Sequence, residues 1–117
     1  MQSGKILVVD DEKDFCFFMK KYLVSKGYRV DIAYDGLQAA EILENERYDA
    51  VFFDCNMPEL SGMELVSIIS KKNPGARKVM ISGYEGINEQ FAEKLDVDVF
   101  LSKPFSLEQL EKMMNEI

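Results

Sequence analysis

Short runs of consecutive apolar residues alternate along this chain with longer segments in which apolar residues recur three or four positions apart. The apolar runs cover residues 6–9, 50–53, 79–81 and 99–101, and they are rich in Val, Ile and Phe. Such runs are typical of β-strands that are buried on both faces of a sheet. Residues 30–33 alternate between apolar and polar side chains, which indicates a strand at the edge of that sheet.

The segments between these runs have the spacing and the end signals of helices. From Phe15 to Leu23, apolar side chains follow the i, i+3, i+4, i+7, i+8 pattern of one helical face, and Gly27 is a natural helix end. Three later helices have N-terminal capping residues, which are Asp35, Ser61 and Ser106. Apolar residues spaced between Ile87 and Leu95 predict a weaker fourth helix.

Strand and helix therefore alternate five times along the chain. Buried strands separated by helices predict an α/β fold with a single doubly wound, five-stranded parallel sheet and helices on both faces. At 117 residues the chain has the length of one domain, and we treat residues 1–117 as that domain. In sheets of this kind, ligands bind outside the carboxyl ends of the strands, so functional side chains are expected there.

The composition excludes several functional classes. Lys and Arg total 14 and Asp and Glu total 21, so the net charge is −7, a poor match for nucleic acid or an anionic membrane. The absence of His excludes Ser-His-Asp and Cys-His catalysis and His-ligated metal sites. Two cysteines cannot form a disulfide framework, and no segment approaches the ~20 apolar residues of a transmembrane helix. We expect a cytoplasmic protein that binds neither nucleic acid nor membranes.

Charged and hydroxyl side chains follow the predicted strands. They are Asp10, Asp11, Asp54, Ser82 and Lys103. Each one alone has an ordinary explanation as a helix cap, a loop hydrogen-bonding group or a solvated lysine. Together, three carboxylates at one edge would repel one another unless a cation lay between them, and Mg²⁺ prefers oxygen ligands. A lysine and a hydroxyl group would suit phosphoryl oxygens, so Asp54, in the centre, is the candidate for accepting a phosphoryl group.

Four stretches of the sequence resemble the receiver domain of bacterial two-component response regulators, and the resemblance covers the whole chain. They are Ile-Leu-Val-Val-Asp-Asp-Glu at 6–12, Phe-Asp-Cys-Asn-Met-Pro at 53–58 with Ser-Gly at 61–62, Met-Ile-Ser-Gly at 80–83 and Phe-Leu-Ser-Lys-Pro-Phe at 100–105. The resemblance implies a flavodoxin-like (βα)5 fold with strand order 2-1-3-4-5. It also implies that Asp54 is the phosphoacceptor and that Mg²⁺ is the cofactor.

The resemblance assigns roles to the residues around Asp54. Asp11, Asp54 and the backbone carbonyl of Asn56 would ligate Mg²⁺, with Asp10 acting mainly through water. Ser82 and Lys103 would hold the phosphoryl oxygens, Ser82 and Phe100 would form the switch, and Pro104 would follow a cis peptide bond. The sequence departs from the usual family pattern before the fifth strand, where Asp-Val-Asp-Val at 96–99 replaces Gly-Ala-Asp-Asp. It departs again at the switch aromatic, because Phe100 lacks the hydroxyl group of the frequent Tyr.

The same resemblance implies a set of partners. The phosphoryl group would come from the phosphohistidine of a sensor histidine kinase or a histidine phosphotransfer protein, which in this family docks near the start of the first helix. A helix cannot bury all four apolar residues 15–18 on one side, so one or two should face solvent there. The face formed by the fourth helix, fifth strand and fifth helix would then control a downstream protein, a covalently linked output domain or a phosphorylation-dependent dimer.

Two other functional classes remain open at this point. The first is a Mg²⁺-dependent phosphatase with an aspartyl nucleophile, although Asn56, which cannot donate a proton, stands where such an enzyme needs a general acid. The second is a flavin or nucleotide binding module on the same fold, although no Gly-rich phosphate loop follows the first strand. The receiver interpretation instead implies a signalling module without an external substrate, and so not an enzyme. The sequence leaves open whether residues 1–117 are the whole protein or part of a larger regulator or hybrid kinase.

Overall fold

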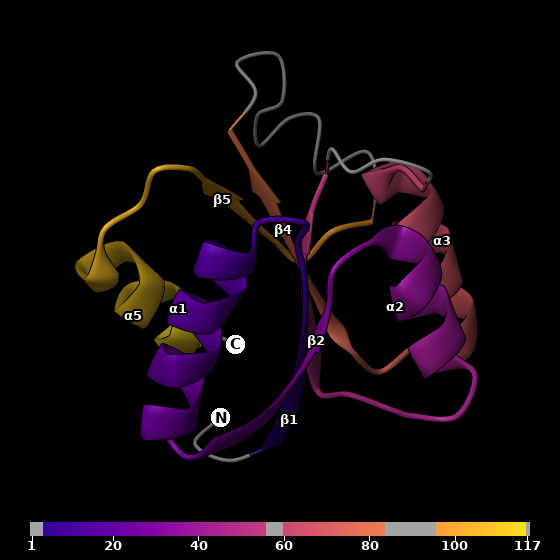
Figure 1. Ribbon diagram of the computed structural model, residues 1–117, viewed down its shortest axis with the longest axis horizontal. Coiled ribbons are helices and arrows are strands. Elements are labelled where there is room, and N and C mark those ends of the chain that lie inside the picture. The colour runs from indigo at the N-terminus through magenta and orange to yellow at the C-terminus, as the bar shows by residue number, and fades with distance from the viewer. Residues whose placement is uncertain (1–3, 56–59, 84–95, 117) are drawn as a thin grey trace.

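A five-stranded parallel sheet with the strand order β2-β1-β3-β4-β5 forms the centre of the computed structural model (Figure 1). The structure describes residues 4–55, 60–83 and 96–116. The strands are β1 (Gly4–Val9), β2 (Tyr28–Ala33), β3 (Ala50–Asp54), β4 (Arg77–Ser82) and β5 (Val99–Ser102). The predicted fold class and strand order are confirmed.

Helices cover both faces of the sheet, with α1 and α5 on one face and α2 and α3 on the other (Figure 1). Their bounds are α1 (Lys13–Ser25), α2 (Gly36–Leu43), α3 (Gly62–Lys72) and α5 (Leu107–Glu116). The fourth helix that the sequence predicts at residues 87–95 lies outside the described residues. None of the helices within the described ranges is long and apolar enough to cross a bilayer.

Two separate groups of buried side chains fill the spaces between the helices and the sheet. Leu7 and Val9 of β1 belong to the group under α2 and α3, here called the α2–α3 core. Ile6 and Val8 belong to the group under α1 and α5, here called the α1–α5 core. Successive side chains of a strand point to opposite faces of the sheet. Because both faces are covered here, the side chains of residues 6–9 are all buried, and this part of the strand is a continuous apolar run.

Local signals fix the ends of the helices as the sequence predicts. The Asp35 side chain accepts a hydrogen bond from the Gln38 backbone N–H at 2.7 Å and caps α2. Ser61 and Glu64 form the reciprocal capping box that begins α3. Gly27 follows α1 with a φ of 98°, a conformation that glycine adopts without steric cost.

The start of α3 lies directly against the end of β3. The Gly62 N–H donates a hydrogen bond to the Cys55 carbonyl oxygen at 3.1 Å. A Cβ atom on Gly62 would lie only 2.7 Å from the Cys55 Cα atom, so no larger residue fits without a shift of the backbone. Because Cys55 follows Asp54, this contact fixes the segment that carries the candidate phosphoacceptor.

Candidate functional site

The carboxyl ends of four strands bring side chains from distant parts of the chain to one edge of the sheet. Asp10 follows β1, Asp54 ends β3, Ser82 ends β4 and Lys103 follows β5. Neighbouring strands are paired up to these residues. Residues up to 93 positions apart in the sequence therefore meet at this edge.

The Lys103 ammonium lies in the middle of this group. Its Nζ atom is 2.9 Å from Oδ2 of Asp10, 3.2 Å from Oε1 of Glu12 and 3.7 Å from Oδ2 of Asp54. The Asp10 side chain is almost completely buried, whereas that of Glu12 is mostly exposed. A buried carboxylate needs a compensating charge, and Lys103 supplies it.

Three carboxylate groups surround this position. Oxygen atoms of Asp10, Glu12 and Asp54 all lie within 4.8 Å of one another. Mg²⁺ takes hard oxygen ligands from one or two carboxylates and completes its shell with water, so this donor set fits that ion. Asp11 is exposed and is not part of this group, and Asn56 lies outside the described residues.

Sequence reasoning did not single out Glu12. The Glu12 backbone N–H donates a hydrogen bond to Oδ1 of Asp10 at 2.9 Å, which makes a tight turn after β1. This turn holds Glu12 where its carboxylate reaches Lys103. An Asp side chain that accepts a hydrogen bond two residues further on is a known local motif, so Asp at the end of a strand was a signal for this turn.

The charges of the site act on Lys103 in two opposing ways. Burial disfavours the ammonium and lowers the pKa of Lys103. The hydrogen bond and the charge of Asp10, the charge of Asp54 and the hydrogen bond to Glu12 act in the other direction and outweigh burial. The net pKa of Lys103 is raised, so the side chain is a cation at neutral pH.

The two predicted switch residues occupy neighbouring strands. Ser82 is buried at the end of β4, and its carbonyl oxygen accepts a hydrogen bond from the Lys103 backbone N–H at 2.8 Å. Phe100 of β5 is half-buried and packs against the α2–α3 core. The Lys103–Pro104 peptide bond is cis, the geometry that the resemblance implies.

Both thiols near the site are held in the neutral form. The Cys16 thiol donates a hydrogen bond to the Asp10 carbonyl oxygen at 3.2 Å. Burial, and secondarily the charge of Asp10, raise the pKa of Cys16 to about 11. Burial also raises the pKa of Cys55. A thiol with a raised pKa is a poor nucleophile and a poor metal ligand, so neither cysteine is a candidate for catalysis.

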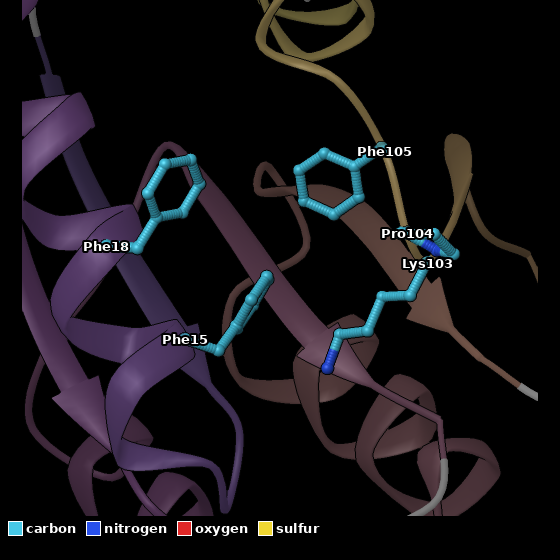
Figure 2. Close-up of a pocket in the computed structure, with 5 residues that line it drawn as sticks. All are labelled: Phe15, Phe18, Lys103, Pro104 and Phe105. Atoms are coloured by element: carbon cyan, nitrogen blue, oxygen red, sulfur yellow. The ribbon is translucent and has the colours of Figure 1, made fainter.

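An apolar pocket of about 390 Å³ opens beside Lys103 (Figure 2). It is lined by Phe15, Phe18, Lys103, Pro104 and Phe105. The sequence predicts that one or two of residues 15–18 face solvent, and the structure confirms this prediction. Phe17 is 69% exposed and Phe18 is 41% exposed, whereas Cys16 is buried. The role of Phe15 beside Lys103 was not predicted.

The model of one protein family, described as the response regulator receiver domain, matches residues 6–115. The chain therefore belongs to the receiver domains of the response regulators of two-component systems. Among curated proteins it is similar to the response regulator MprA of Mycobacterium ulcerans, with 32% identity over 117 residues. That alignment covers 98% of this chain and 50% of the relative. The chain thus spans about half the length of the curated relatives it matches.

Solved structures of receiver domains have the same fold. A CheY-like response regulator receiver domain protein from Methanospirillum hungatei superposes with a TM-score of 0.87 and 30% identity, covering 96% of this chain and 90% of the other. The response regulator TrrA of Thermotoga maritima, solved in complex with Mg²⁺ and BeF, superposes with a TM-score of 0.84 and 29% identity, covering 96% of each chain.

Proposed function

We propose that this chain is a phosphoacceptor signalling module in which Asp54 receives a phosphoryl group from the phosphohistidine of a partner protein. The observation that carries the proposal is the Lys103 ammonium, which lies within 4 Å of the carboxylates of Asp10, Glu12 and Asp54. A cation among carboxylates at the edge of a parallel sheet is suited to phosphoryl transfer, which depends on positioning and charge stabilisation. Membership of the receiver family supports the same role.

Magnesium is the cofactor in this proposal. Asp10, Asp11, Asp54 and the backbone carbonyl of Asn56 would hold the ion, and Glu12 lies within reach of Asp10 and Asp54. When bound, Mg²⁺ would neutralise the negative charge of the carboxylates and of the incoming phosphoryl group. The gathered carboxylate oxygens support this assignment.

The transfer step follows from the chemistry of Asp54. A carboxylate oxygen of Asp54 forms the new bond to phosphorus, and the bond from phosphorus to the donor histidine nitrogen breaks with its electron pair left on nitrogen. Lys103 Nζ is 3.7 Å from Asp54 Oδ2, so it is placed to offset charge on the phosphoryl oxygens. Ser82, on the neighbouring strand, would donate its hydroxyl group to another of these oxygens.

The partners in this proposal are a donor and a receiver of the signal. The apolar pocket between α1 and the segment after β5 supports docking of a sensor histidine kinase or a histidine phosphotransfer protein. The signal would leave through the face that contains Phe100, β5 and α5, toward a downstream protein, a linked output domain or a second copy of the chain. The chain would act on no external substrate and so would not be an enzyme.

The direct test of this function is labelling with a small phosphodonor. Incubation with acetyl phosphate and Mg²⁺ is expected to add one phosphoryl group, seen as a single mass increase of the intact protein. Asp54→Asn removes the nucleophilic oxygen and is expected to abolish the increase. Equal labelling of Asp54→Asn and the wild-type protein would overturn the proposal.

A second test follows the signal away from Asp54. A non-hydrolysing phosphoryl mimic with Mg²⁺ is expected to shift amide NMR signals from the site to Phe100 and along β5. The physical reason is that Ser82 must move toward the phosphoryl group, which leaves space for the Phe100 ring. Shifts that remain confined to the neighbours of Asp54 would contradict this switch while leaving the phosphoacceptor role in place.

A further inference from the structure

The Phe15 ring contacts the same Lys103 ammonium that the three carboxylates contact. Lys103 Nζ lies 4.2 Å from the centroid of the Phe15 ring, which is the geometry of a cation–π interaction. The two side chains come from α1 and from the segment after β5, and they face each other at the pocket (Figure 2). The Lys103 side chain is only 18% exposed, so its contacts are largely shielded from water, where a cation–π interaction is stronger than at an exposed site.

The orientation of this ring is fixed by its own neighbours. Phe15 meets the ring of Phe105 edge to face, with the centroids 5.9 Å apart and the planes at 88°. Both rings also pack against the α1–α5 core. Phe105 lies two residues after Lys103, so the ring that covers the ammonium is held by the same segment that carries the ammonium.

The ring and the carboxylates hold Lys103 by different chemistry. Asp10 and Asp54 attract the ammonium, but their oxygens are also the candidate ligands of a divalent cation. A phenyl ring has no lone pair for a hard cation, so its attraction to Lys103 does not depend on whether the carboxylates are shared. Phe15 is therefore the contact of Lys103 that stays available when the acidic side chains are occupied.

We infer that Phe15 is a positioning residue for phosphoryl transfer, which holds the Lys103 ammonium beside Asp54 through the face of its ring. This inference rests on the proposed function and adds a residue to it. It differs from a docking role for the pocket, because it acts through Lys103 and is needed even when the phosphodonor is a small molecule.

Substitutions at Phe15 distinguish the effect of the aromatic ring from the effect of its apolar volume. With acetyl phosphate and Mg²⁺, Phe15→Leu is expected to slow phosphorylation about 3- to 30-fold, the range that corresponds to a cation–π interaction. Phe15→Tyr keeps the ring face and is expected to retain a rate close to that of the wild-type protein. Phe17→Leu is the matched control. The Phe17 ring is exposed, does not line the pocket and lies 6.0 Å from the Nζ atom of a different lysine, Lys21. Equal rates for Phe15→Leu and Phe17→Leu would overturn the inference.

A double-mutant cycle tests whether Phe15 acts through Lys103. Phe15→Leu is expected to slow phosphorylation no further when it is added to Lys103→Ala, because the ammonium is already absent. The same slowing in both backgrounds would overturn the inference in favour of a general structural role. Labelling of Asp54→Asn is measured in parallel. If that variant is labelled as well as the wild-type protein, the proposed phosphoacceptor role fails, whatever the result at Phe15.

Two readouts do not depend on phosphorylation. The ring current of Phe15 is expected to shift the methylene proton signals of Lys103 next to Nζ, and Phe15→Leu but not Phe15→Tyr should remove that shift. The Mg²⁺ concentration that half-saturates thermal stabilisation should not rise in Phe15→Leu, because Phe15 is not a ligand. An unchanged Lys103 signal, or weaker Mg²⁺ binding that matches the slower phosphorylation, would contradict a positioning role.

Discussion

At the scale of single residues, the buried Cys16 thiol next to Asp10 has an altered pKa. Its thiol is buried and donates to the carbonyl oxygen of Asp10, so the thiolate form would lie in apolar surroundings beside a carboxylate. Burial and the charge of Asp10 together raise the pKa of Cys16 from 9.0 to about 11. The folded protein therefore holds this proton more tightly than the unfolded chain does.

This raised pKa predicts a pH-dependent stability. Well below pH 9 the Cys16 thiol is protonated in both the folded and the unfolded protein, so its full contribution to the free energy of unfolding is present. Between about pH 9 and 11 the unfolded chain releases the proton and the folded protein does not, so this contribution is lost as the pH rises. When the pH is raised from 8 to 10, the free energy of unfolding of the wild-type protein should fall by about 1 kcal/mol more than that of Cys16→Ala. Urea unfolding of both proteins at the two pH values measures the change. A constant difference between the proteins would contradict the assignment.

Asp96 adopts a backbone conformation that is unusual for its residue type. Its φ of 58° lies in the left-handed region, where the sequence has Asp in place of the glycine that is frequent in the family. Asp is one of the few residues that tolerate this region. Its carboxylate also lies 3.7 Å from Nζ of Lys78, whose side chain is only 7% exposed.

Two substitutions at Asp96 separate the backbone from the ion pair. Both Asp96→Gly and Asp96→Ala remove the carboxylate, so the difference between them reports the backbone conformation alone. Asp96→Gly is expected to be more stable than Asp96→Ala by about 1 kcal/mol, since alanine is strained at a positive φ. Thermal or urea unfolding of the pair gives this difference, and equal stabilities would show that the segment before β5 adjusts freely.

At the scale of secondary-structure elements, the first residue of α3 lies directly against Cys55, the residue that follows Asp54 at the end of β3. Gly62→Ala places a methyl group 2.7 Å from the Cys55 Cα atom, so the start of α3 must move away from β3. We expect a loss of about 1–3 kcal/mol in the free energy of unfolding, the usual cost of overpacking, and slower phosphorylation of Asp54.

Gly75 provides a matched control for this substitution. A Cβ atom on Gly75 would meet nothing within 4 Å, and its φ is not in the left-handed region. Gly75→Ala is therefore expected to leave stability unchanged or raise it by up to about 1 kcal/mol, because alanine restricts the unfolded chain. Chemical denaturation of both variants tests the pair, and a similar loss at Gly62 and Gly75 would contradict the role of close packing.

At the scale of the whole molecule, Mg²⁺ should stabilise the folded state. The carboxylates of Asp10, Glu12 and Asp54 come together only in the folded chain, so an ion held by them would bind that state preferentially. At 100 times its Kd, Mg²⁺ would raise the free energy of unfolding by about 2.7 kcal/mol. Differential scanning calorimetry with and without a chelator measures the effect. Asp10→Asn should reduce the Mg²⁺-dependent increase in Tm, and an undiminished increase would place the ion elsewhere.

Much of the architecture could be predicted from the sequence because it depends on local patterns. Continuous apolar runs predicted strands buried on both faces, and strand ends predicted that Asp10, Asp54, Ser82 and Lys103 share one edge. The contact between Phe15 and Lys103 could not be predicted in this way. It depends on the rotation of α1 about its axis and on the side-chain rotamer, which the apolar spacing of a helix restricts only to one face.

The sheet separates the apolar pocket beside Lys103 from the Phe100 ring. Phe15 and Phe105 pack against the α1–α5 core, Phe100 packs against the α2–α3 core, and no described residue belongs to both buried groups. If the pocket binds the phosphodonor, as proposed above, substitutions under α1 and α5 would change which donor is recognised without repacking the layer under α2 and α3. Under the proposed function, a duplicated copy of the gene would then acquire a new upstream partner while the packing around Phe100 is inherited intact.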